Sequence, residues 1–375
     1  MRVLHVGKFY PPHAGGMESH LELLCRMTKA DVDLQVLVSA DDPHTVHELV
    51  DGIPVTRVGT KLTLASASLN PGMAREIRRA DADLVHFHHP NPTAVLSYRA
   101  ARPRGRLVVT YHSDIVRQRV LGPLFSPILH RFLRRADAVI ASSPNYAASS
   151  PVLRRHAERV SVIPFGIDPH EFQQVDQDEA AAIRRHHGER IVFAAGRLVY
   201  YKGFDYLVRA MRRVDAALLI AGDGPLRGEL ARLAAEESVA GRVTLLGPVP
   251  DLRPYYHAAD VFALPSVARS EAFGIVQMEA MACGLPVVNT ALDTGVPFVS
   301  PDGVSGLTVA PADVDALADA LNRLLGDAAL RGRLGRGGRE RVAGELSAAT
   351  MARRTLELYR TVAATPARSK LSGSP

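Results

Sequence analysis

The chain has 375 residues, 47% of them hydrophobic and 22% charged, which is enough for two globular domains with ordinary cores. No apolar run approaches the roughly 20 residues that span a bilayer, and the first residues lack the apolar region of a signal peptide. A cytoplasmic location is therefore expected. The two cysteines, Cys25 and Cys283, lie in unrelated contexts, so neither a disulfide framework nor a cysteine metal site is expected.

The formal net charge of +6 is compatible with nucleic acid, a membrane surface or phosphorylated ligands as partners. Nothing in the sequence resembles a helix-turn-helix, a zinc finger or an aromatic-studded sheet, so nucleic acid is not expected. The charge is unevenly distributed, because nine arginines and a single acidic residue, Asp114, lie between Arg99 and Arg135.

Short apolar runs rich in β-branched residues alternate with longer amphipathic stretches, which is typical of βα units and a parallel sheet. In the first half, the predicted strands are residues 2–6, 34–39, 55–58, 84–88, 107–112, 138–142 and 160–164. A polar stretch from Phe165 to about Gly188 predicts the join between two domains. A second series of predicted strands follows at 191–195, 217–221, 243–246, 261–265, 286–289 and 307–309.

The last third of the chain shows apolar spacings of three and four, which predict helices over residues 314–325, 328–343 and 347–362. Residues 364–375 show no such period and are expected to form a frayed tail. The predicted fold class is α/β, with two tandem Rossmann-like domains facing across a cleft, at residues 1–166 and 167–346. Residues 347–375 are expected to supply a helix that packs back on the first domain, followed by the tail.

The first predicted strand leads into a loop that contains Gly15 and Gly16 and is followed by a helix. Two adjacent glycines let the backbone approach an anion, whose charge the start of a helix favours. The alternative is a flexible turn that accommodates Pro11 and Pro12.

At the end of the strand over 191–195, Arg197 and Lys202 lie five residues apart on one loop. An arginine fork and a lysine point charge can converge on one phosphate group. The alternative is a pair of ordinary surface cations, although the position at the carboxyl end of a strand favours the phosphate.

The segment from Glu271 to Glu279 follows another predicted strand and opens a helix. A carboxylate can accept hydrogen bonds from two vicinal hydroxyls, as in a ribose or a sugar ring. Amides at the helix start can bind a diphosphate. Those amides belong to Phe273, Gly274, Ile275 and Val276. The alternative is an acidic loop with an exposed helical glutamate.

His112 ends a strand of the first domain, where an imidazole can handle a proton or donate to a developing charge. A purely structural histidine is the alternative. Three Asp-x-Asp pairs (31 and 33, 81 and 83, 313 and 315) could hold a metal, but two precede strands and the third is typical of a helix cap. The glycine-rich segment 222–228 departs from the dinucleotide fingerprint in its third glycine.

Taken together, these segments resemble the retaining GT-B glycosyltransferases of family 4 over nearly the whole chain. The resemblance rests on the Gly15–Gly16 loop, His112, the segment 164–168, Gly196-Arg197-Leu198 with Lys202-Gly203, and above all Glu271 to Glu279 with the sequence that continues it. One departure is Phe165, where the family often has asparagine, and a change in hinge contacts is expected there.

The resemblance implies roles for single residues. Arg197 and Lys202 would bind the donor diphosphate, together with backbone amides at Gly16 and at 273–276, and Glu279 would accept the ribose hydroxyls. Glu271 and His112 would hold the transferred sugar, and the loop around Val249 would lie against the base. The first domain would be the acceptor side and the second would bind the sugar nucleotide.

The implied reaction is the transfer of a hexosyl group from a nucleotide sugar to a glycan or lipid-linked saccharide, with retention, in polysaccharide biosynthesis. Fixed cations and helix dipoles would neutralise the leaving diphosphate, so neither a metal nor another cofactor is expected. The segment 289–298 resembles bacterial polysaccharide mannosyltransferases of this family, so GDP-mannose is the first donor to consider, with UDP-sugars as the alternative.

Residues 121–135 combine helically spaced apolar side chains with arginines. One interpretation is a basic helix on an anionic membrane, which would make the enzyme peripheral at the inner face of that membrane. The other is an ordinary helix packed on the sheet. Two rival functions also stay open: a sugar-nucleotide epimerase or hydrolase with the same fold, and a non-catalytic sugar-nucleotide-binding protein.

Overall fold

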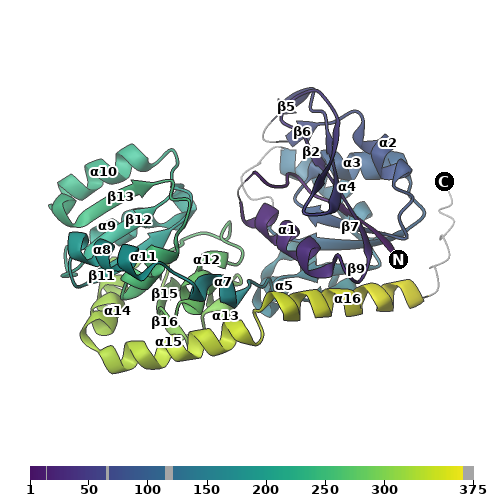
Figure 1. Ribbon diagram of the computed structural model, residues 1–375. Coiled ribbons are helices and arrows are strands. Elements are labelled where there is room, and N and C mark those ends of the chain that lie inside the picture. The colour runs from purple at the N-terminus through teal and green to yellow at the C-terminus, as the bar shows by residue number, and fades with distance from the viewer. Residues whose placement is uncertain (14, 65–66, 115–120, 366–375) are drawn as a thin grey trace. The chain divides into compact units, whose positions relative to one another are not determined.

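The computed structural model describes residues 1–13, 15–64, 67–114 and 121–365. The chain forms two compact units, each built on a twisted sheet that is wholly or mainly parallel (Figure 1). The first unit contains Met1–Ala141, Arg155–Ile163 and the C-terminal helix from Met351 onward. The second unit contains Ser142–Arg154 and Pro164–Thr350.

In the described part of the first unit, eight strands form one sheet in the order β10-β9-β8-β7-β1-β2-β4-β3. Their bounds are β1 Arg2–Val6, β2 Asp33–Ser39, β3 Val46–Val50, β4 Ile53–Val58, β7 Leu84–His89, β8 Arg106–Tyr111, β9 Ala138–Ala141 and β10 Val160–Val162. All neighbours are parallel except β3, which is antiparallel to β4. A separate antiparallel pair comprises β5 Leu62–Leu64 and β6 Ala67–Leu69.

The helices of the first unit cover both faces of its sheet. They are α1 Gly16–Thr28, α2 Met73–Arg79, α3 Pro92–Ala101, α4 Leu121–Leu133 and α16 Ala348–Ala364, with the 3-10 turn η1 Ala157–Arg159. On one face, α1 and α16 bury Leu24 and Tyr359 in a core with Val3. On the other, Phe132 of α4 lies edge-on to Phe87 of β7 and Tyr98 of α3, with ring centroids 4.9 and 5.4 Å apart.

The second unit has six parallel strands in the order β13-β12-β11-β14-β15-β16 among its described residues. They are β11 Ile191–Ala195, β12 Ala217–Ala221, β13 Val243–Gly247, β14 Val261–Leu264, β15 Val287–Thr290 and β16 Gly306–Val309. Side chains alternate along each strand, because Val192 and Ala194 of β11 enter one core while Ile191, Phe193 and Ala195 enter the other.

The second unit contains the following helices, several of which cover the two faces of its sheet. They are α5 Pro144–Ser149, α6 Pro151–Arg154, α7 Pro169–Gln173, α8 Gln177–His187, α9 Phe204–Ala210, α10 Arg227–Glu236, α11 Arg253–Ala258, α12 Ile275–Ala282, α13 Val296–Val299, α14 Val314–Gly326 and α15 Ala328–Ala343, with the 3-10 turns η2 Tyr200–Lys202 and η3 Ala240–Arg242. Helices α9, α10 and α14 pack into one core, whereas α11, α12 and α13 pack into the other.

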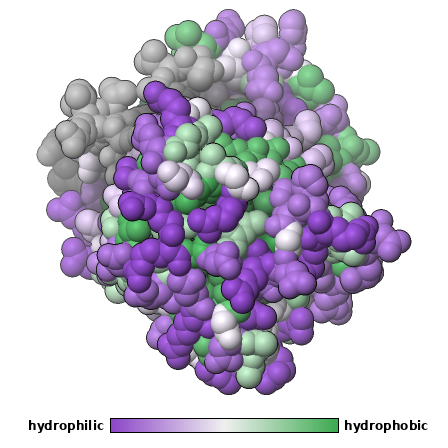
Figure 2. All heavy atoms as spheres, turned by 90° about the vertical axis from the view of Figure 1, so that its left-hand side faces the viewer, coloured by the Kyte–Doolittle hydropathy of each residue, from purple (hydrophilic) through white to green (hydrophobic). Residues whose placement is uncertain are grey.

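The surface of the second unit that carries α8 and α10 is mainly hydrophilic, with hydrophobic side chains in small separate groups (Figure 2). Such a distribution is typical of a face in contact with water. Among the described residues, no helix has the length and apolar character that crossing a membrane requires.

Candidate active site

The strand order of the second sheet reverses at β11, which lies between β12 and β14. Ligands of open parallel sheets bind outside the carboxyl ends of the strands at such a reversal. Two loops leave the sheet there, one after β11 and one after β14. They contact each other directly, because the Val267 N–H donates to the Tyr201 carbonyl at 2.9 Å.

These loops bring Lys202 and Glu271 into an ion pair, with 2.6 Å between Lys202 Nζ and Glu271 Oε2. Both side chains are largely buried, with exposed fractions of 11% and 10%. The Ser266 hydroxyl donates to the same carboxylate oxygen at 3.2 Å. Since an ammonium group has three N–H donors, the pairing leaves donors of Lys202 for an anionic ligand.

Gly196 lies directly beneath the Lys202 side chain. Its φ of +144° belongs to a region that favours glycine, and an added Cβ would lie 3.1 Å from Lys202 Cε. The next residue, Arg197, is exposed and forms no ion pair with any residue that the structure describes. The sequence thus brings two cations to one strand end, one already paired and one unpaired.

Glu279 lies in the middle of helix α12. Its Oε2 accepts a hydrogen bond from the Tyr256 hydroxyl at 2.7 Å. Burial raises the pKa of the Glu279 carboxyl, while the Tyr256 hydrogen bond and the charge of Lys202 act in the opposite direction. The helix begins after Gly274, whose φ is +80°, so the amides of 273–276 lie at its positive end.

A cavity of about 450 Å³ opens beside Glu279. Its walls include Phe172 and the chain from Pro250 to Arg253, which follows β13. Val249, on the same loop, is half-buried and packs against the core of the α12 face. The cavity therefore lies between Glu279, which the family resemblance would assign to the ribose, and the loop of Val249, which it would assign to the base.

In the first unit, the strand order reverses at β1, which lies between β2 and β7. Gly15 is the residue before helix α1, in extended conformation with φ 171°, and Gly16 is the first helical residue. Both are exposed. An added Cβ at Gly15 would lie 2.4 Å from Glu18 Oε2, the end of a flexible side chain that can move aside, so the space here does not by itself require glycine.

The sequence predicted that His112 is the last residue of a strand over 107–112. In the structure strand β8 ends at Tyr111, and His112 is the next residue. Its ring is buried, and its Nε2 lies 3.1 Å from Nδ1 of His88. Burial lowers the pKa of His112 well below its ordinary value, and the nearby His20 and His89 lower it further. The imidazole is therefore neutral at physiological pH.

Two of the three Asp-x-Asp pairs have structural partners. Asp81 and Asp83 both pair with Arg2, at 3.0 and 3.1 Å. Asp313 caps helix α14 by accepting from the Ala316 N–H at 2.9 Å. These carboxylates support the ends of strands and helices.

Sequence reasoning missed the partners that hold the predicted groups. Nothing in the sequence around Tyr256 or Ser266 marks either residue as a neighbour of a glutamate, because that contact depends on the tertiary fold. The histidines around His112 could have been predicted more easily. His86 and His88 stand two residues apart on one strand, and strand periodicity places both on the same face.

Two doubly wound units in tandem, each with a reversal of strand order in its sheet, are the architecture of the GT-B class of glycosyltransferases, and comparison with known proteins agrees. Residues 14–171 match the family described as Glycosyltransferase Family 4, and residues 189–327 match Glycosyl transferases group 1. O-antigen chain mannosyltransferase C of Escherichia coli is 33% identical over 96% of this chain and 99% of its own length. The chain belongs to glycosyltransferase family 4 and is a hexosyltransferase.

Two further relatives are similarly close. D-rhamnosyltransferase WbpZ of Pseudomonas aeruginosa is 35% identical over 86% of each chain. The GDP-mannose-dependent alpha-(1-6)-phosphatidylinositol monomannoside mannosyltransferase of Mycolicibacterium smegmatis is 32% identical over 90% of this chain and 92% of its own. The names of these relatives thus include more than one transferred sugar.

Solved structures confirm the predicted fold class. Sucrose-phosphate synthase from Thermosynechococcus elongatus superposes with a TM-score of 0.79 at 26% identity, covering 96% of this chain and 98% of that chain. Anabaena Alr3699/HepE in complex with UDP-glucose gives a TM-score of 0.79 at 22% identity, with 96% and 100% coverage.

Proposed function

We propose that the protein transfers a mannosyl group, with retention, from GDP-mannose to a saccharide or lipid-linked saccharide in polysaccharide biosynthesis. The observation that carries the proposal is the pair of cations, Arg197 and Lys202, beside Glu271 at the reversal point of the second sheet. The mannosyltransferase relatives supply the choice of sugar and base. The similarly close D-rhamnosyltransferase makes the donor sugar the feature most in need of a test.

In this proposal, the second unit binds the nucleotide sugar and the first unit serves the acceptor. Arg197 and Lys202 bind the diphosphate, with the amides of 273–276 and of Gly16. Glu279 accepts the ribose hydroxyls, and the base enters the cavity along the Val249 loop. The orientation of Glu279 supports this role, because Tyr256 donates to one carboxylate oxygen and leaves acceptor positions for a diol.

Glu271 and His112 hold the transferred sugar near its reacting carbon. The role of Glu271 is supported by its fixed position, since Lys202 and Ser266 both contact its Oε2. Cleavage of the sugar–phosphate bond places negative charge on the diphosphate and positive character on the anomeric carbon. Cations and helix dipoles that are already in place stabilise that charge without reorganisation. The acceptor hydroxyl attacks from the face that the diphosphate leaves, and a phosphate oxygen accepts its proton.

The donor is tested by incubating the enzyme with radiolabelled GDP-mannose, UDP-glucose and UDP-galactose. We expect GDP-mannose to be turned over, slowly to mannose and GDP without acceptor and faster with a lipid-linked saccharide. Turnover of a UDP-sugar alone would overturn the choice of donor but not the family. Isomerised nucleotide sugar as the product would favour the epimerase instead.

We further propose that the enzyme acts at the inner face of a membrane through the basic residues at the end of helix α4 and in the turn that follows it. Arg131, Arg134 and Arg135 are exposed, whereas Phe132 and Leu133 are buried in the unit. The contact is therefore electrostatic, without insertion of those apolar side chains. Co-sedimentation with anionic vesicles should occur at low salt and fail for Arg131→Glu with Arg134→Glu. Equal sedimentation with neutral vesicles would contradict it.

A further inference from the structure

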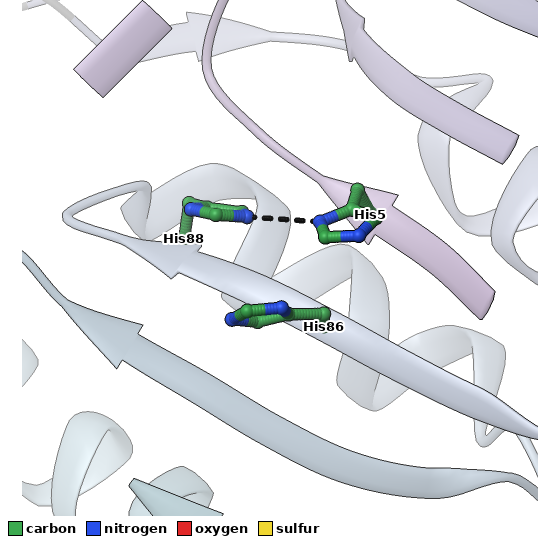
Figure 3. Close-up of side chains that lie close together, drawn as sticks. All are labelled: His5, His86 and His88. Atoms are coloured by element: carbon green, nitrogen blue, oxygen red, sulfur yellow. Dashed lines mark hydrogen bonds between the residues drawn. The ribbon is translucent and has the colours of Figure 1, made fainter. Parts of the chain in front are cut away.

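A row of buried imidazoles connects His112 to the C-terminal helix. His5 lies on β1, His86 and His88 lie on β7, and Tyr359 reaches them from α16. Figure 3 shows the three histidines side by side, with the hydrogen bond between His5 and His88. All four side chains are fully buried, so contacts among them are not exchanged for contacts with water.

The contacts form one continuous chain of hydrogen bonds. Thr110 Oγ1 lies 2.6 Å from His86 Nε2, and His86 Nδ1 lies 2.5 Å from the Tyr359 hydroxyl. That hydroxyl lies 3.5 Å from His5 Nε2, which is the longest link. His5 Nδ1 then lies 3.1 Å from His88 Nε2, and His88 Nδ1 lies 3.1 Å from His112 Nε2.

Burial lowers the pKa of each of these four histidines, so each ring is neutral near pH 7. A neutral imidazole has one N–H donor and one acceptor nitrogen. Every link needs one donor and one acceptor, so when the Tyr359 hydroxyl donates its proton along the chain, the protons can be arranged in only two ways. In one, all four histidines carry the proton on Nε2. In the other, all four carry it on Nδ1.

The lengths of the links favour the first arrangement. Hydroxyl donors approach their acceptors more closely than N–H donors do, and the Tyr359–His86 link, at 2.5 Å, is shorter than the Thr110–His86 link, at 2.6 Å, so we take Tyr359 as the donor. Tyr359 therefore donates to His86 Nδ1, and His86 Nε2–H donates to Thr110. His5 Nε2–H then donates to the Tyr359 oxygen, and His88 and His112 follow with the proton on Nε2.

We propose that this chain sets which nitrogen of His112 carries the proton, and that Tyr359, His5 and His88 are positioning residues for His112. The consequence for catalysis rests on the proposed role of His112 in holding the transferred sugar. A histidine with a fixed tautomer presents a fixed donor and acceptor to its surroundings. The C-terminal helix thus acts on the site through Tyr359, without touching the sugar.

The same nitrogens could instead hold a metal, since ligand atoms of His5, His86 and His88 lie within 4.8 Å of one another. The hydrogen bonds favour the proton chain over the metal. Both ring nitrogens of His86 already face hydroxyl groups, and the nitrogens of His5 and His88 face each other pairwise instead of converging on one point.

The test is the tautomer of each ring, read from the ¹⁵N chemical shifts of ¹⁵N-histidine-labelled protein. We expect His5, His86, His88 and His112 to share the Nε2–H tautomer. Tyr359→Phe removes one oxygen, so we expect His112 to gain a measurable Nδ1–H population. Tyr98→Phe, which alters a buried tyrosine of the same unit outside the chain, should leave the His112 tautomer unchanged.

A second variant acts at the other end of the chain. Thr110→Val removes the acceptor of His86 Nε2–H, and a buried N–H without a partner is more costly than an acceptor without one. We therefore expect all four rings to shift toward Nδ1–H. Different tautomers among the four wild-type rings, or a His112 tautomer that responds to neither variant, would overturn the proposal.

Two further readouts complete the test. Tyr359→Phe should lower kcat by about 2- to 10-fold, the range for one lost hydrogen bond, with the donor KM unchanged. If no transfer is detected at all, the proposed function fails while the tautomer result still stands. Zinc or cobalt bound stoichiometrically by the purified protein, with loss of the ring-to-ring hydrogen bonds, would replace the proton chain by a metal site.

Discussion

Lys202 and Glu271 form a buried ion pair whose two members are both assigned to ligand binding. Removing one member of such a pair leaves an uncompensated charge, which commonly destabilises a protein by about 3–5 kcal/mol. Lys202→Ala would therefore mix a loss of stability with a loss of ligand binding. Arg197, exposed and without an acidic partner among the described residues, gives a cleaner measurement of the same electrostatic claim.

The hydrogen bond between Tyr256 and Glu279 gives a first prediction at the scale of one residue. Tyr256→Phe removes the donor that orients the carboxylate, so the donor KM should rise by about 2- to 10-fold, as expected for one net hydrogen bond. Tyr255→Phe changes the neighbouring tyrosine, which stacks on Phe193, and should leave KM unchanged. Equal KM values for the Tyr256 variant and the wild type would contradict the assignment of Glu279 to ribose binding.

The buried histidines predict that the protein loses stability in acid. Burial lowers the pKa of His5, His20 and His89 to about 3, against an ordinary 6.5. Below pH 6.5 the unfolded chain binds protons on these rings, whereas the folded chain does not. The stability that the neutral rings contribute to the folded state is therefore fully present above pH 6.5 and is lost as the pH falls toward 3. Each ring should lower the free energy of unfolding by up to about 1.4 kcal/mol per pH unit.

Urea unfolding between neutral pH and about pH 5 measures this slope. His89→Phe is the sharpest variant, because both ring nitrogens of His89 lack a hydrogen-bond partner among the described residues and the ring stacks on Tyr111 with centroids 4.7 Å apart. This variant should reduce the slope of the free energy of unfolding against pH by the share of one proton, without loss of stability at neutral pH. A wild-type stability independent of pH would contradict the buried, neutral state of the cluster.

At this scale, the sequence indicated residue types but not their partners. Arg197, Lys202, Glu271 and Glu279 could be singled out because they lie on the loops and the helix that follow two strand ends, where ligands of such sheets commonly bind. Tyr256 could not, since it is one aromatic residue among several in its helix. Its contact with Glu279, 23 residues away, exists only after α11 and α12 pack together.

Among the elements, the loops after β11 and β14 depend on Gly203. Its φ is +67°, and an added Cβ would lie 2.1 Å from the Pro265 carbonyl oxygen. Gly203→Ala should therefore destabilise the protein by about 1–3 kcal/mol and weaken nucleotide binding, because the loops must separate. Gly228→Ala is the matched control, with no atom within 4 Å of the new Cβ.

The control should stabilise helix α10 by about 0.5–1 kcal/mol, since alanine favours a helix more than glycine does. Chemical unfolding of both variants, alongside titration with a nucleoside diphosphate, gives both quantities. Unchanged stability for Gly203→Ala would show that the two loops do not meet as closely as the Val267–Tyr201 hydrogen bond requires.

Elements with a buried face were well predicted, and exposed ones were not. The strands at 2–6, 191–195 and 217–221 and the helix at 328–343 have the predicted bounds. Strand β3 was missed because its side chains are exposed or half-buried and so leave no apolar run. Its turn could have been found, because Asp51 and Gly52 both have positive φ, and Asp-Gly is a strong hairpin signal.

For the whole molecule, the parallel order of strands made the two-sheet architecture predictable, because alternating βα units permit few other arrangements. The chain path was harder to foresee. Segment Ser142–Arg154 groups with the second unit, although it lies in sequence between two segments of the first. Tyr359, near the end of the described chain, lies beside His5, near its beginning, and no local pattern predicts a contact across that separation.

The absence of a metal requirement is a prediction for the complete enzyme. With fixed cations at the diphosphate, kcat should be unchanged after treatment with a chelator such as EDTA, and magnesium should add nothing. The initial rate of sugar transfer measures this directly. Activity that disappears with EDTA and returns with magnesium would contradict charge neutralisation by Arg197 and Lys202 alone.

The most direct test of the central claim is calorimetric titration with GDP and UDP in the presence of EDTA, for the wild type, Arg197→Ala and Arg232→Ala. Arg232 is an exposed residue of helix α10 and controls for the loss of one positive charge. We predict that the wild type binds GDP, that Arg197→Ala weakens binding by about tenfold or more, and that Arg232→Ala binds as the wild type does. Equal binding by all three proteins, or no binding of either nucleotide by the wild type, would contradict the claim that Arg197 helps to bind the donor diphosphate.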